Sequence, residues 1–436
     1  MAVRQYENEA TIEPPIMENA AAELYRYFGE TTAIPRAISA SIWMLGGMFL
    51  FLLSKNLSQS HQTAFFSLAF YLLLPYAISA SRAFQPDPLM ICLIIMFWWS
   101  MEHWGRESSW KWTFASGISG GLAILVKFPA VFFIIGGALG IIIASITIPT
   151  AIKKIQTWVI VVLGLIPPAA YLYYGTYVAR FLGRQFNDRI YPEMWISPFF
   201  YLRWFLKFEN VISVPWMALA LAGLVIFANK KEKIFLGSLW LSYLLYGLTF
   251  AHHISSHDYY SLPAIPLIAL CISLAAVAFS KTLLATSATI HLPNKYLPAI
   301  PLQLFYNSLL LGSILLITVT QYTQMRANDY RAQANFWQEV GNAVGHQPGV
   351  IALTTDYGYP LAYYGWQNSS LWPASVNIQD YDETFNDLAK NKDYFLITDF
   401  EEYDRQPGLQ ERLEKTFPVL AQGRGYLVFD LGHPLK

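Results

Sequence analysis

The stretch PAVFFIIGGALGIIIASITI (residues 129–148) contains 20 residues and no charged side chain. A helix of about 20 apolar residues is long enough to cross the hydrocarbon core of a bilayer. Nine other stretches have a similar character. The ten candidate spans are residues 36–54, 63–81, 88–104, 112–126, 129–148, 157–175, 213–229, 234–251, 260–279 and 303–322. The sequence therefore predicts a polytopic α-helical membrane protein with about ten transmembrane helices.

The composition supports this class of protein. The chain has 436 residues, of which 55% are hydrophobic and 13% are charged. A soluble protein carries about twice that share of charged residues. These values exclude a disordered chain, a coiled coil, a disulfide scaffold and an ordinary cytosolic enzyme. The net charge is zero, which gives no reason to expect a nucleic-acid partner. Cys92 and Cys271 lie in apolar runs, which is typical of buried structural thiols.

The last part of the chain has a different character. Residues 325–436 contain 15 acidic and 9 basic side chains. Short apolar runs that read as strands alternate there with helical patterns. The expected strands are residues 350–356, 393–400 and 425–431, and the expected helices are residues 335–344 and 409–417. We therefore expect a small C-terminal α/β domain outside the bilayer, and a transmembrane domain over residues 33–324.

Residues 1–32 form a polar segment before the first span. Within it, residues 16–28 place Ile16, Met17, Leu24 and Phe28 on one face of a helix. Such a helix either lies on the bilayer surface or packs on the helix bundle. The segment contains no signal peptide.

Lysine and arginine in short loops indicate the orientation, because these residues are retained on the cytoplasmic side. The cluster Lys230, Lys231 and Lys233 is the strongest marker. The longer loop 176–212 carries basic residues on the opposite face and weakens this bias without reversing it. This orientation places both termini outside the cytoplasm. An outside N-terminus is simplest to explain if a first transmembrane helix is missing from this chain.

Two candidate functional residues lie near predicted helix ends on the outer face. Asp87 lies between Pro86 and Pro88, which predicts an extended turn, and Arg82 precedes it. This charged pair is either an interfacial feature or part of a site in which Asp87 acts as a base or metal ligand. Lys127 is flanked by apolar residues, where a charge is costly and therefore a functional candidate. Its ammonium either reaches the interface or binds a phosphate.

Two further clusters lie on the same predicted face. Residues 252–260 contain His252, His253 and His257 in a spacing too irregular for a firm metal motif. We interpret this cluster as part of a polar outer cavity, with a zinc site as the alternative. Glu7, Glu9 and Glu13 precede Pro14–Pro15, and by themselves they read as a solvated acidic stretch.

The ordered set of these motifs resembles the GT-C glycosyltransferases, in the group of protein mannosyltransferases and aminoarabinose transferases. The matching segments cover about residues 10–325, and none of them is specific alone. They are EPPIMENAAAELYRYFGE (13–30) leading into PRAISA (35–40), RAFQPDPLM (82–90), GLAILVKFPA (121–130) and HDYYSLPAIP (257–266).

The resemblance implies an enzyme of the plasma (inner) membrane whose active site faces outward. Its members transfer a sugar from a polyprenyl-phosphate donor to a lipid, glycan or protein acceptor, and some use a divalent metal ion. Asp87 corresponds to the acid of the second outer loop. Lys127 corresponds to a phosphate contact, and Arg82, His257 and Tyr259 are expected to bind substrate.

This chain departs from the family pattern at the acid of the first outer loop. In the family this acid follows a first helix, which would lie before Met1. Glu7 or Glu9 is the candidate stand-in, and Glu9 is the predicted catalytic acid. A truncated and inactive copy is therefore one alternative for this chain, and a membrane transporter or a non-catalytic membrane protein is another. Transporters often show repeated halves, and the sequence contains no such repeat.

Overall fold

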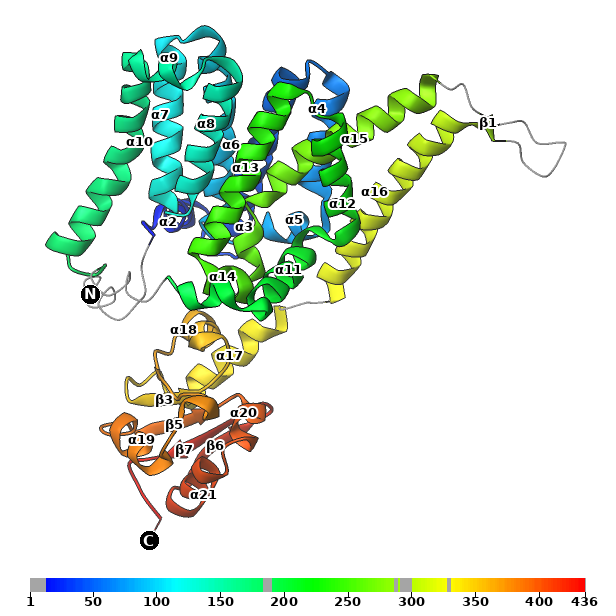
Figure 1. The fold of residues 1–436 in the computed structure, drawn as a ribbon. Helices are drawn as coiled ribbons and strands as arrows, with labels where there is room; N and C mark the ends of the chain where they lie inside the picture. Colours follow the sequence, from blue (N-terminus) through cyan, green and yellow to red (C-terminus); the bar gives the residue numbers. More distant parts are fainter. Residues whose placement is uncertain (1–12, 183–189, 286–288, 291–299, 328–330, 436) are drawn as a thin grey trace. The chain divides into compact units, whose positions relative to one another are not determined.

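A computed structural model describes residues 13–182, 190–285, 289–290, 300–327 and 331–435. The chain divides into two compact units, Met1–Tyr322 and Thr323–Lys436 (Figure 1). The first unit is helical and the second contains a five-stranded sheet.

Each of the ten apolar runs contains a helix. The helices of the first unit are α2 (Ile16–Phe28), α3 (Ala33–Ser58), α4 (His61–Leu73), α5 (Pro75–Ala80), α6 (Asp87–Glu107), α7 (Trp110–Val126), α8 (Ala130–Ser145), α9 (Ile148–Lys153), α10 (Ile155–Tyr173), α11 (Pro198–Ile212), α12 (Val214–Ala222), α13 (Lys230–Thr249), α14 (Ala251–Ser256), α15 (Ala264–Ala285) and α16 (Leu302–Ala327). Single π turns, Tyr174–Val178 and Gly223–Phe227, extend α10 and α12. A short 3₁₀ turn, η4 (Asp258–Ser261), follows α14, and another, η2 (Pro192–Ile196), precedes α11. A two-residue ladder pairs β1 (Thr289–Ile290) with β2 (Ile300–Pro301).

Fewer than ten helices qualify as membrane spans when the length and hydropathy of each described helix are considered. Of the described helices, four are long and apolar enough to cross a membrane, and the bent pair α11–α12 adds a fifth if it counts as one span. The fold is that of a polytopic membrane protein, as expected. The count of about ten spans remains a prediction.

Glycine lets two helices of the bundle approach closely. A Cβ atom on Gly121 of α7 would lie 2.4 Å from the backbone oxygen of Leu163 in α10, and one on Gly117 would lie 2.7 Å from the Leu163 side chain. Small residues serve this purpose in membrane helix packing. Helix α7 is therefore closely packed against α10.

Two helix breaks shape the region around the candidate site. The predicted span 63–81 is divided into α4 and α5 at Leu74–Pro75, because proline cannot donate the backbone hydrogen bond that a continuous helix needs. The predicted loop 176–212 contains α11, which bends by 87° from the helix that continues through α12. Helix α11 is not expected from the sequence, which predicts a loop there.

The second unit is a sheet with helices on both faces. Its strands are β3 (Val350–Leu353), β4 (Ser370–Leu371), β5 (Tyr394–Ile397), β6 (Val419–Gly423) and β7 (Tyr426–Asp430), in the spatial order β4-β3-β5-β7-β6. The strand β3 pairs in parallel with β4 and β5, and β7 pairs antiparallel with β5 and β6. The helices are α17 (Arg331–Ala343), α18 (Tyr359–Tyr364), α19 (Tyr381–Leu388), α20 (Phe400–Asp404) and α21 (Pro407–Thr416).

The strands β3 and β5 are apolar along their whole length because both faces of the sheet are covered. Ile351 and Leu353 belong to one core with residues of α19, α20 and α21. Val350 and Ala352 belong to a second core with residues of α17 and α18. Continuous apolar strands are typical of sheets buried on both faces.

Candidate active site

Asp87 and Lys127 meet because of how their helices begin and end. Asp87 is the first residue of α6, and Lys127 directly follows the last residue of α7. These helices are consecutive along the chain and pack together, so the beginning of one lies beside the end of the other. The expected extended turn at Asp87 is wrong. Pro88 occupies the first helical turn, where its missing N–H is tolerated, so the helix already begins at Asp87.

The two side chains form a buried ion pair. The distance from Lys127 Nζ to Asp87 Oδ2 is 2.8 Å, and the side chains are 11% and 4% exposed. Removal of water from both groups is costly, and their mutual attraction must offset that cost. Asp87 also gains from its place at the N-terminus of α6, where the helix dipole favours a negative charge.

Two aromatic rings line the ammonium group. Lys127 Nζ lies 5.2 Å from the centroid of the Tyr259 ring and 5.6 Å from that of the Tyr260 ring. A cation over an aromatic face is stabilised by about 0.5–2 kcal/mol, and more strongly when water is excluded. Both tyrosines belong to η4, which lies within HDYYSLPAIP.

Two carboxylates besides Asp87 belong to this cluster. Glu13 acts electrostatically on both Lys127 and Tyr259. Asp258 and Asp87 both act electrostatically on the Tyr76 hydroxyl. The sequence analysis missed Tyr76, which lies in an apolar run outside every matching motif. The nearest signal was Pro75, which marks the helix break that places this tyrosine.

Of the remaining predicted residues, the structure describes His257 and Arg82 but not Glu7 and Glu9. The His257 ring is next to Tyr259, with 5.5 Å between ring centroids, and its Nδ1 is 2.7 Å from Ser256 Oγ. Arg82 lies in the turn after α5, where its backbone N–H donates to the Ser79 carbonyl and its side chain is exposed. Glu9 and Glu7 lie outside the described residues.

The zinc alternative for residues 252–260 is not supported by the geometry. In the described part of the chain, no group of three or more His, Cys, Asp or Glu side chains is arranged to hold a metal ion. The rings of His252, His253 and His257 instead pack against one another and against Tyr260. A divalent metal therefore does not fit the described residues, and we assign no chemical step to one.

The arrangement can bind an anion and accept a proton. A lysine ammonium has three N–H donors, and the pair with Asp87 uses one of them. An anionic oxygen that approaches Lys127 would find a donor in surroundings largely shielded from water, where such a bond is strong. Asp87 supplies a carboxylate 2.8 Å from the same ammonium group. One site thus combines a cation that can hold an anionic group with a carboxylate that can accept a proton.

Comparisons with known proteins identify a similar family and a similar fold. Residues 13–174 match the family described as dolichyl-phosphate-mannose-protein mannosyltransferase. That segment contains Glu13, Asp87 and Lys127. No curated protein gives a significant match to the chain.

Two crystal structures of ArnT from Cupriavidus metallidurans share the fold. The structure bound to undecaprenyl phosphate has a TM-score of 0.56 at 14% sequence identity, and the match covers 97% of this chain and 88% of that chain. The apo structure has a TM-score of 0.57 at 15% identity, covering 96% and 87%. The predicted resemblance to the GT-C glycosyltransferases of this group is confirmed.

Proposed function

We propose that this chain is an integral membrane glycosyltransferase that moves a sugar from a polyprenyl-phosphate donor to an acceptor outside the cytoplasm. The family match and the ArnT fold support a membrane transferase of the GT-C type. One of the similar ArnT structures is bound to undecaprenyl phosphate, which supports a lipid phosphate of this class as the partner.

The observation that carries the proposal is the convergence of four distant segments on one ammonium group. Glu13, Asp87 and Tyr259 come from three of the matching motifs, and all of them act on Lys127 in the fourth. Nearly 250 residues separate the first of these segments from the last. A chance interfacial lysine would not be surrounded by residues from all four motifs.

We assign the roles as follows. The acceptor hydroxyl attacks the anomeric carbon of the donor sugar, and Asp87 takes the hydroxyl proton. The bond between the anomeric carbon and the phosphate oxygen breaks, and the polyprenyl phosphate leaves with the electron pair. Lys127 stabilises the charge that develops on that phosphate. Tyr259, His257 and Arg82 are assigned to substrate binding, and Glu9 remains the predicted first-loop acid.

The proposal is tested with the full chain in lipid nanodiscs and undecaprenyl phosphate as the probe. Lys127→Ala should weaken binding of this lipid roughly 10- to 100-fold, because a hydrogen bond to a charged group contributes about 1.5–3 kcal/mol. Lys127→Gln retains a donor to Asp87 without the charge and should also bind weakly. Lys111→Ala is the matched control, since Lys111 is an exposed lysine near the other end of α7.

Two outcomes would contradict the proposal. Equal binding by the Lys127 variants and the wild type would remove Lys127 from the phosphate site. Transport of a solute across proteoliposomes, without formation of a glycosidic bond in any sugar-transfer assay, would favour a transporter. Melting temperatures of all variants separate loss of binding from loss of the fold.

A further inference from the structure

In the second unit, the chain diverges at the ends of two neighbouring strands. Strands β3 and β5 pair in parallel (Figure 1). The chain leaves β3 into α18, whose Leu361 belongs to the same core as Val350. It leaves β5 into α20, whose Tyr403 belongs with Ile351 to the core on the opposite face of the sheet. Ligands of open α/β sheets bind at the carboxyl ends of strands where the connections diverge in this way.

The ends of the two strands meet through a pair of hydroxyl groups. Thr354 follows β3 and Thr398 follows β5, and Thr398 Oγ1 donates a hydrogen bond to Thr354 Oγ1 over 2.8 Å. Both side chains are half-buried. Asp399 is next in the chain, and its backbone N–H donates to the Leu353 carbonyl at 3.2 Å. We call residues 354–359 and 398–400 the carboxyl edge, and the strands fix the positions of its hydroxyl groups.

The backbone of the carboxyl edge is strained where it turns out of β3. Asp356 and Tyr357 have φ angles of 52° and 54°, in the left-handed region. Each such residue costs on the order of 1–3 kcal/mol, and such residues cluster at functional sites. The turn leaves the Tyr357 side chain 79% exposed and the Tyr359 side chain 67% exposed, with 6.3 Å between the ring centroids. These rings are not part of the core, so packing does not explain the strain.

The side chains of the carboxyl edge indicate the class of ligand. The edge contains two acidic residues, Asp356 and Asp399, and no basic residue. Two carboxylates repel a phosphate, and they oppose a bilayer surface even though tyrosine suits that interface. Among the described residues, no group of three His, Cys, Asp or Glu side chains is arranged to hold a metal ion. A neutral sugar fits, because its hydroxyl groups bind carboxylates and hydroxyl groups while its C–H faces pack on aromatic rings.

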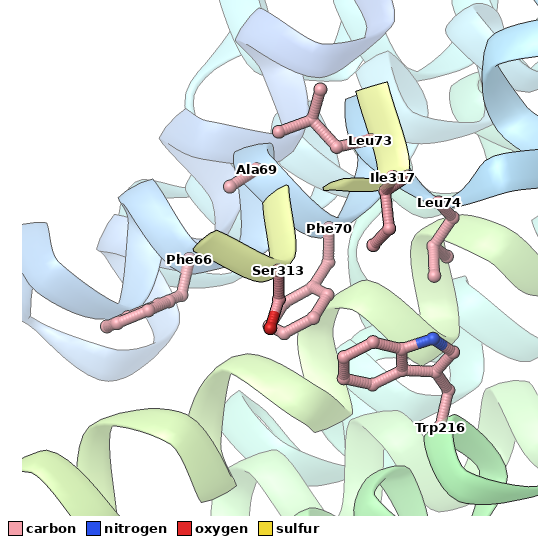
Figure 2. A pocket seen from close by; sticks show the side chains of 8 residues that line it. All are labelled: Phe66, Ala69, Phe70, Leu73, Leu74, Trp216, Ser313 and Ile317. Atoms are coloured by element: carbon pink, nitrogen blue, oxygen red, sulfur yellow. The ribbon is translucent and has the colours of Figure 1, made fainter. Parts of the chain in front are cut away.

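The pocket of the first unit lacks this combination. Figure 2 shows Phe70 and Leu74 facing Trp216, with Ser313 on the other side. Ser313 carries the one hydroxyl group among the residues that line this pocket. A sugar bound there would leave most of its hydroxyl groups without a partner, and each buried polar group of this kind is costly.

We propose that the carboxyl edge is a carbohydrate-binding site of the second unit. Tyr357 and Tyr359 pack against the face of a sugar ring, and Asp356 and the Thr354–Thr398 pair bind its hydroxyl groups. This inference goes beyond the proposed transfer reaction, because the carboxyl edge shares no residue with the site around Lys127.

The test uses the full chain in deuterated detergent micelles, with saturation-transfer NMR to detect weak binding. The probes are neutral tetrasaccharides of glucose, mannose and N-acetylglucosamine. We expect at least one of these probes to bind. Tyr357→Ala should weaken that binding about tenfold or more, equivalent to about 1.4 kcal/mol. Tyr357→Phe retains the ring and should bind as the wild type does.

Tyr357→Gly separates loss of the ring from loss of the fold. Glycine adopts a positive φ without strain, so the melting temperature should not fall, although binding should weaken as in Tyr357→Ala. Trp366→Ala is the matched control. Trp366 is 70% exposed with a φ of 49°, but it precedes β4 and therefore lies at the amino ends of the parallel strands. This control should bind the sugar as the wild type does.

The inference is overturned if none of the tetrasaccharides binds, which would leave a bilayer surface as the partner of the exposed tyrosines. It is also overturned if Tyr357→Ala and Tyr357→Gly bind the sugar as the wild type does, because the sugar would then lie elsewhere on the chain. The proposed function fails in a different experiment, when Lys127→Ala leaves binding of undecaprenyl phosphate unchanged.

Discussion

At the scale of single residues, Asp87 has two tasks that compete. It pairs with Lys127 at 2.8 Å, and it is the proposed base for the acceptor. A carboxylate that is paired with an ammonium group is a weaker base than a free one. A phosphate that binds Lys127 competes for the same N–H donors and draws the ammonium away from Asp87. Donor binding would then prepare the base for its reaction.

Asp87→Asn tests this competition. The amide keeps an oxygen that can accept a hydrogen bond from Lys127 but removes the competing negative charge. Undecaprenyl phosphate should therefore bind more tightly, by about five- to tenfold, since a like charge close to the phosphate is removed. Turnover should fall about 100-fold or more, as expected on loss of a general base. Binding is measured by titration in nanodiscs and turnover by sugar transfer. Weaker binding in this variant would show that Asp87 positions Lys127 and does not compete for it.

At the scale of secondary structure elements, the sequence predicts residues at helix ends well. The sequence identifies Asp87 and Lys127 because a charged side chain next to an apolar run must lie near the end of a membrane helix. Tyr259 is identified through the family resemblance. Helix α2 was predicted with the bounds that the structure has. Tyr76 was missed because it interacts electrostatically with Asp258, which is 182 residues away in sequence. No local pattern reports such a contact.

The missed elements share one physical reason. Helix α11 has Phe200, Trp204 and Phe208 on its buried face, but Arg203 and Lys207 interrupt its apolar run. These charges lower the mean hydropathy of a window as long as a membrane span, so the sequence predicts a loop here. The strand β4 has two residues, which is too short for an alternating pattern to appear. Both elements are stabilised by tertiary contacts and not by a strong local preference.

In the second unit, Glu402 makes α20 sensitive to acid. The backbone N–H of Ser375 donates to Glu402 at 2.5 Å and Gln406 donates to it at 2.9 Å, and these bonds lower the pKa of this carboxyl to about 2. Gln406 in turn accepts a hydrogen bond from the buried Trp372 indole. Because the folded-state pKa lies below the ordinary value of 4.5, this stabilisation is complete above that pH. It is lost as the pH falls towards 2.

We expect Glu402→Gln to flatten this pH dependence. The amide oxygen still accepts from Ser375, but it does not titrate. Lowering the pH from 6 to 3 should cost the wild type more stability than the variant, by on the order of 1 kcal/mol for this largely solvent-screened group. Urea unfolding of residues 323–436, followed by tryptophan fluorescence, measures the difference. Glu411→Gln is the control, because Glu411 is an exposed carboxylate paired with Lys415. Equal losses in the wild type and Glu402→Gln would contradict the assignment.

At the scale of the whole molecule, three helices each carry their basic residues at the end that lies away from the candidate site. Helix α6 begins at Asp87 and carries Arg106 in its last turn. Helix α7 has Lys111 in its first turn and leads into Lys127. Helix α13 begins with Lys230 and Lys231 and leads through α14 to η4 with Tyr259. In these three helices, the basic residues other than Lys127 thus lie at the ends remote from the site. Because positively charged loops are retained in the cytoplasm, we predict that the site faces outward.

The last prediction follows from this orientation and from the second unit. Residues 325–436 are acidic and follow α16, which leads away from the basic loops if the predicted spans all cross the bilayer. We therefore expect a reporter that fluoresces only in the cytoplasm to be dark when fused after Lys436. The same reporter inserted after Lys231, next to the strongest basic cluster, should be bright. The paired fusions distinguish orientation from expression, because both chains carry the complete first unit. A bright signal after Lys436 would require an even number of crossings between the two positions, whereas the predicted spans 234–251, 260–279 and 303–322 give three. It would place the acidic unit on the opposite side from the site and remove it from any part in acceptor binding.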